Sequence, residues 1–123
     1  MHSPHSFDIK SIKPQTISNG GNRTIANSYN FPILKGMATY SLLLKKGGVR
    51  EPHWHPNASE LSYRVSGKAL MTIFGHGDTH NTFTLERDEI AFVGDNELLL
   101  SLFFTSLLVL SFRLYKKVFN TFL

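Results

Sequence analysis

Two histidines and a glutamate lie close together in this sequence, and their side chains could bind a metal ion. One residue separates His53 from His55, and Glu60 follows a short polar stretch after them. Residues i and i+2 of a β-strand point to the same face, so His53 and His55 would present two imidazoles side by side. Pro56 cannot donate to a neighbouring strand and is expected to end this one.

Residues 56–59 (PNAS) have the composition of a turn, and Glu60 would open the next strand. If that strand runs back beside the first, its carboxylate faces the same point as the imidazoles. Two neutral imidazoles and one carboxylate suit Mn, Fe, Ni, Cu or Zn. A metal with open positions would act there as a Lewis acid on a carboxylate or carbonyl group. The alternative is a chance His-x-His pair on a solvated strand.

The spacing around these residues favours the metal site. Gly47, His53, His55, Glu60 and Gly67 fit the pattern G-x5-H-x-H-x4-E-x6-G. The sequence around Gly67 predicts a tight turn, because glycine readily adopts a positive φ.

This pattern resembles the first sequence motif of the cupins. Residues 50–58 (REPHWHPNA) are similar to the oxalate decarboxylase and germin-like branch, and the likeness runs from about residue 31 to Val93. The resemblance implies an all-β fold, the cupin barrel (double-stranded β-helix or jelly roll). It also implies that such barrels associate through their N-terminal arms, so a homo-oligomer is expected.

The resemblance also implies roles for individual residues. His53, His55 and Glu60 would be the metal ligands, usually to manganese, and Arg50 would contact the carboxylate of the substrate. A guanidinium can bind a carboxylate through two parallel hydrogen bonds, so this role is chemically sound. The alternative for Arg50 is a surface ion pair with Glu51 or Glu60.

The second cupin motif, G-x5-P-x-G-x2-H-x3-N, has no counterpart here. Laid over residues 88–103, none of its fixed positions matches, and Leu99 stands where a fourth, histidine ligand is expected. We therefore expect an incomplete barrel, truncated or frameshifted after Val93, with weaker and less specific metal binding. His76 and His80 are candidate substitute ligands, although a solvated loop is the favoured interpretation for both.

Short strands at close spacing, with almost no helical periodicity, favour a sandwich or barrel. Leu61 and Tyr63 alternate with Ser62 and Arg64, the period of a half-buried strand. The other expected strands cover residues 40–44, 69–74, 82–85 and 89–93. We divide the chain into an N-terminal arm (1–31) with one or two short strands, a partial cupin domain (32–97) and a tail (98–123).

The tail is apolar and then basic. Residues 98–112 carry no charge, and Arg113, Lys116 and Lys117 follow. A buried strand or core helix is the favoured interpretation, since the stretch is shorter than the ~20 residues of a membrane-spanning helix. A short membrane or interfacial segment and an unrelated fused sequence are the alternatives.

Composition restricts the function classes further. The 123 residues suffice for one domain, and the absence of cysteine excludes thiolate ligands and disulfides. The net charge is +4, but outside the basic tail the chain is nearly neutral, so we expect no nucleic-acid partner. The N-terminus has no apolar segment typical of a signal peptide, which predicts a cytoplasmic protein.

Three functions fit these observations. The first is a manganese-dependent decarboxylase or oxidase acting on oxalate-like acids. The second is a non-catalytic, germin-like cupin that binds a small carboxylate. The third is a degraded barrel without activity.

Overall fold

The computed structural model describes the backbone of residues 3–54, 58–94, 97–103 and 107–115. Side chains are described for all of these except residues 51, 52, 54 and 99–115.

The described residues form ten β-strands in two sheets. The six-stranded sheet has the order β1-β2-β3-β10-β5-β8, and the four-stranded sheet has the order β4-β9-β6-β7. Their bounds are β1 (Thr16–Ser18), β2 (Gly21–Ala26), β3 (Met37–Leu44), β4 (Val49–Trp54), β5 (Ala58–Arg64), β6 (Ala69–Phe74), β7 (His80–Leu85), β8 (Ile90–Val93), β9 (Leu98–Phe103) and β10 (Leu107–Tyr115).

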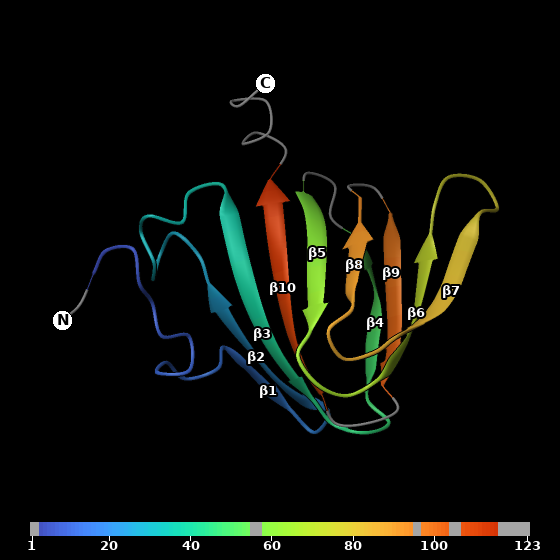
Figure 1. The fold of residues 1–123 in the computed structure, drawn as a ribbon, viewed down its shortest axis with the longest axis horizontal. Coiled ribbons are helices and arrows are strands. Elements are labelled where there is room, and N and C mark those ends of the chain that lie inside the picture. The colour runs from blue at the N-terminus through green and yellow to red at the C-terminus, as the bar shows by residue number, and fades with distance from the viewer. Residues whose placement is uncertain (1–2, 55–57, 95–96, 104–106, 116–123) are drawn as a thin grey trace.

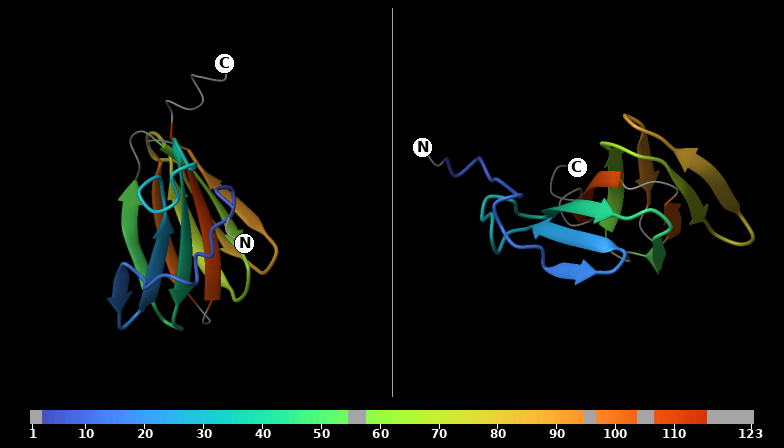
Figure 2. Two further views of the ribbon diagram at one scale, coloured as in Figure 1. Left: turned by 90° about the vertical axis from the view of Figure 1, so that its left-hand side faces the viewer. Right: turned by 90° about the horizontal axis from the view of Figure 1, so that it is seen from below.

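The strands share one long direction, with β1 to β3 on the left of Figure 1 and β6 and β7 on the right. The end-on view in Figure 2 shows the strands arranged around a common interior. Every sheet pairing is antiparallel, and most join strands distant in sequence. This is the all-β jelly-roll architecture expected from the sequence.

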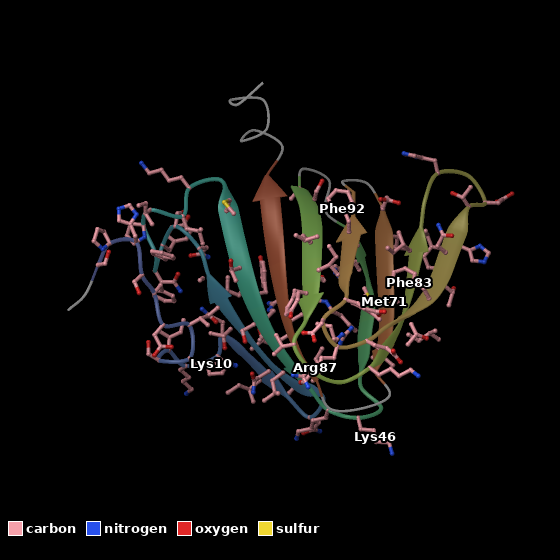
Figure 3. All side chains as sticks on the ribbon, viewed as in Figure 1. Lys10, Lys46, Met71, Phe83, Arg87 and Phe92 are labelled. Atoms are coloured by element: carbon pink, nitrogen blue, oxygen red, sulfur yellow. The ribbon has the colours of Figure 1, made fainter. Side chains whose placement is uncertain are left out.

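Two predicted turns, at Gly47 and Gly67, separate strands as expected. The turn expected at 56–59 is wrong in part, because β5 already begins at Ala58 rather than at Glu60, and residues 56 and 57 lie outside the described residues. The strand expected at 69–74 is β6, and the others lie within β3, β5, β7 and β8, give or take a residue at their ends. Gly47 has φ 78° in the β3–β4 turn, and Gly67 has φ 79° in the β5–β6 turn. Lys46 marks the β3–β4 turn at the lower end of the molecule in Figure 3. Glycine is favoured at both positions because a Cβ atom disfavours positive φ.

The apolar tail supplies two strands of the fold. β9 pairs with β4 and β6, and β10 lies between β3 and β5. The described residues of this segment are therefore strands rather than a helix. Among the described residues, no helix is long and apolar enough to span a membrane. A frameshift or fusion after Val93 stays a prediction, which the nucleotide sequence around that codon would test.

The core lies between the two sheets, in two clusters that each draw on both. One joins three residues of β3 to Ala69 of β6, and the other joins β6 and β7 to β8. Met71 and Phe83, labelled in Figure 3, belong to the second cluster and its border. The buried members are Ala38, Tyr40, Leu42 and Ala69 in the first, and Met71, Leu85, Ala91 and Val93 in the second.

Strand β5 has the predicted period, but its polar residues face the interior. Glu60, Ser62 and Arg64 are buried, whereas Leu61 and Tyr63 are only half-buried on the outer face. The Tyr63 hydroxyl donates a 2.6 Å hydrogen bond to Asp88 Oδ1, which raises the pKa of Tyr63. Alternation correctly predicts that the two faces of the strand differ. The buried face, however, is the polar one that carries Glu60, and not the one that carries Leu61 and Tyr63.

Candidate metal centre

His53 and Glu60 reach the candidate centre from opposite sheets. His53 lies on β4, which pairs with β9 in the four-stranded sheet, while Glu60 lies on β5, which pairs with β8 and β10 in the six-stranded sheet. The expectation that the two strands run side by side is therefore wrong. The chain crosses between the sheets after Trp54, and the side chains converge across the interior instead.

The convergence is close enough for a shared cation. His53 Nε2 lies 4.0 Å from Glu60 Oε2, and the two side chains are 21% and 5% exposed. This distance is too long for a hydrogen bond. It is about twice the ~2.1 Å bond that imidazole nitrogen or carboxylate oxygen makes to a first-row metal. The donor types, their separation and their burial thus fit a divalent metal.

Ser62 holds the Glu60 carboxylate from the other side. Its hydroxyl donates a 3.2 Å hydrogen bond to Glu60 Oε1, which leaves Oε2 facing His53. Such outer partners orient metal ligands and tune their basicity. The sequence pattern of the metal ligands does not include Ser62. The available signal was its position two residues after Glu60, on the same face of the strand.

We predict that Ser62→Ala weakens Mn²⁺ binding by about tenfold, because the carboxylate loses the group that orients it. Isothermal titration would measure the change. Ser59→Ala, on the opposite face of the same strand, is the matched control and should bind as the unmodified protein does. Equal affinity in the two variants would assign Ser62 no role in the centre.

Arg50 and His53 line one cavity of about 490 Å³, although they are three residues apart on β4. In a regular strand an odd separation places two side chains on opposite faces. The register of β4 against β9 shifts between Arg50 and His53, as at a β-bulge. A bulge adds a residue to one strand and re-aims its side chains, which brings both residues to the cavity.

The other three candidate ligands are His55, His76 and His80, and none of them is seen beside Glu60 in the described part of the chain. His55 lies outside the described residues. His76 and His80 are exposed in and after the β6–β7 connection. His53 and the strand that carries His80 are three strand spacings apart, because β9 and β6 lie between β4 and β7 and the residue in register with His53 on β7 is Asn81. At ~4.8 Å per spacing, about 14 Å separates His53 from this position. Across the described part of the chain, no three His, Asp or Glu residues form a group that could hold a metal.

The position opposite His53 in the β4–β9 ladder is Leu99. Directly opposed residues of antiparallel strands occupy the same side of the sheet. The backbone therefore brings position 99 beside His53, where the resemblance places a fourth ligand. Leucine offers no donor atom, so this position contributes no ligand in the present sequence.

The two-sheet jelly roll, with His53 and Glu60 close together inside it, is the arrangement expected of a cupin. A family model described as cupin matches residues 7–120, and the chain belongs to this family. Oxalate decarboxylase OxdC of Bacillus subtilis (strain 168) is 36% identical over 91 residues, which are 73% of this chain and 24% of that enzyme. A probable oxalate decarboxylase of Arthroderma benhamiae is 35% identical over 96 residues, covering 77% and 24%.

Solved structures agree with the sequence comparison. A mutant of the Bacillus subtilis oxalate decarboxylase superposes with a TM-score of 0.82 at 30% identity, covering 89% of this chain and 29% of the other. The same enzyme at pH 4.6 gives a TM-score of 0.80 at 31% identity, covering 88% and 28%. The chain spans about a quarter of the length of the curated relatives it matches.

Proposed function

We propose that this cupin binds a divalent metal through His53, His55 and Glu60 and holds a small carboxylate beside it with Arg50. The observation that carries the proposal is the approach of His53 Nε2 to Glu60 Oε2 across the interior. The Bacillus subtilis relative has Mn(II) centres, which makes manganese the first metal to test. Iron, nickel, copper and zinc accept the same donors.

Each residue has a distinct task in this proposal. Glu60, oriented by Ser62, supplies the negative charge that the metal requires, and His53 supplies a neutral nitrogen. The metal would act as a Lewis acid toward the bound carboxylate. Arg50 lines the cavity that His53 also lines, so its guanidinium can orient a carboxylate by a paired, charge-assisted hydrogen bond.

Metal binding is tested by titrating the purified chain with Mn²⁺. We predict that Glu60→Gln and His53→Ala lower the affinity at least a hundredfold, because each removes one of three ligands. His76→Ala, which removes an exposed imidazole, should leave the affinity unchanged. Retention of full affinity in Glu60→Gln would remove the basis of the proposal. Circular dichroism of each variant separates loss of ligand from loss of fold.

Turnover is a separate question. An oxalate-decarboxylase or oxidase activity is one candidate, supported by the relatives. Binding without turnover is the second candidate, favoured by Leu99 at the position opposite His53. Formate, carbon dioxide and hydrogen peroxide measured after incubation with oxalate and Mn²⁺ distinguish the two. A homo-oligomer and a cytoplasmic location also stay predictions, testable by sedimentation and by cell fractionation.

A further inference from the structure

The cavity beside the candidate metal centre extends beyond what the proposed function uses. It lies between β1 to β3 of one sheet and β4 of the other, and its volume is about 490 Å³. At ~30 Å³ per water molecule, this space corresponds to on the order of fifteen waters. Oxalate, the smallest dicarboxylate, would fill only a small part of it.

Arg23 on β2 is a second arginine in the lining of this cavity. Its Nη2 donates a 3.3 Å hydrogen bond to Thr16 Oγ1, and its guanidinium carbon lies 5.9 Å from the centre of the Tyr40 ring. The hydroxyl and the ring therefore anchor the guanidinium without neutralising its charge.

The guanidinium of Arg23 has unused capacity for an anion. Its Nε is buried and has no hydrogen-bond acceptor within the described part of the chain. Neither do the described residues give Arg23 an ion-pair partner. A guanidinium has five N–H donors, and Thr16 uses one of them, so the terminal nitrogens can still bind a carboxylate that enters the cavity.

The lining mixes aliphatic side chains with the polar side chains of Thr16, Ser18 and Asn22. Arg23 comes from the six-stranded sheet and Arg50 from the four-stranded sheet, and Leu42, Leu44 and Val49 lie on the walls. No Asp or Glu belongs to the described lining. Two arginines from different sheets, with aliphatic side chains in the same lining, suit a ligand that has two carboxylates joined by methylene groups.

We propose that Arg23 is a second carboxylate-binding residue, and that the cavity takes a linear dicarboxylate longer than oxalate. One carboxylate binds Arg50 and the other binds Arg23, while the methylene groups contact the leucines. The Arg50 end rests on the proposed function, and the Arg23 end rests on the contacts described above. Val49 is exposed, so the ligand has an entrance from solvent on this side.

Calorimetric titration of the full chain with oxalate, succinate, glutarate and butyrate tests the proposal. Succinate or glutarate should bind at least tenfold more tightly than oxalate or butyrate. Arg23→Gln should lower the affinity for succinate and glutarate about tenfold to a hundredfold, and so remove their advantage over butyrate. The affinity for butyrate should stay unchanged. Arg87→Gln, an exposed arginine outside the cavity, should change none of these values.

Two results would overturn the proposal: oxalate as the tightest ligand, or a dicarboxylate preference that survives Arg23→Gln. Mn²⁺ titration of the same variant separates this failure from failure of the proposed function. Arg23→Gln should keep full Mn²⁺ affinity, because Arg23 is not a proposed metal ligand. The metal centre is tested by Glu60→Gln alone, whatever the result for Arg23. Arg23→Lys retains charge without the planar fork and should recover part of the preference, which a purely structural role of Arg23 would not produce.

Discussion

Replacing Gly21 with alanine is expected to lower the free energy of unfolding by at least about 3 kcal/mol and the melting temperature by roughly 10 °C. Gly21 opens β2, has φ 138° and is buried against β3. A Cβ atom there would overlap the Leu43 carbonyl oxygen and lie 2.9 Å from Leu44 Cα. Because both neighbours are backbone, β2 and β3 would have to separate.

The matched control for this prediction is Gly47→Ala. Gly47 also has a positive φ, 78°, but a Cβ atom at Gly47 would meet nothing within 4 Å. Its substitution should cost only the conformational strain, about 1–2 kcal/mol. Thermal and urea denaturation measure both variants. Equal losses would show that backbone crowding at the β2–β3 pair adds nothing to the conformational cost.

Replacing Arg64 with methionine is expected to stabilise the protein by about 1–3 kcal/mol. Arg64 is 1% exposed, and its burial lowers its pKa to about 10, well below the usual value of an arginine. The folded chain thus binds this proton less tightly than the unfolded chain. The charge therefore destabilises the fold at every pH below about 10, and the cost disappears only as the pH rises from there through the higher pKa of the unfolded chain. Methionine keeps an unbranched apolar chain over the inner part of the site and removes the charge.

Two further variants isolate the effect of the charge at position 64. Arg64→Lys keeps a buried cation and should give no gain in the urea midpoint. Arg87→Met removes an exposed arginine, 76% of whose side chain is accessible, and should change stability by less than about 0.5 kcal/mol. If Arg64→Met is less stable than the unmodified chain, the contacts of the guanidinium outweigh its desolvation.

The sequence predicts the strands of this fold better than their partners. Alternation and turn glycines gave the bounds of β6 and placed β5 with its start two residues late, because both signals depend on neighbouring positions. The pairing of β4 with β9 and of β5 with β10 depends on residues some fifty positions apart, about which local patterns carry no information. The hairpin expected between β4 and β5 failed for this reason.

The sequence predicted that His53 and Glu60 lie close together, but not what surrounds them. The spacing of His53 and Glu60 identified a pair that the structure brings to 4.0 Å, although from opposite sheets. The positions of Ser62 beside Glu60 and of Arg23 in the cavity could not be predicted, because a serine or an arginine on a strand belongs to no recognisable sequence motif. The bulge between Arg50 and His53 places both side chains on the same face of β4, whereas strict alternation would place them on opposite faces.

The central place of β10 has a consequence for how the chain acquires its shape during synthesis. β3 and β5 both hydrogen-bond to β10. While β10 is still inside the ribosome, the emerged strands present two open edges, which are prone to pair with other chains. Assembly of the six-stranded sheet must therefore wait until residues 107–115 have left the exit tunnel. Slow translation near this point would lengthen the period in which nascent chains are exposed to aggregation.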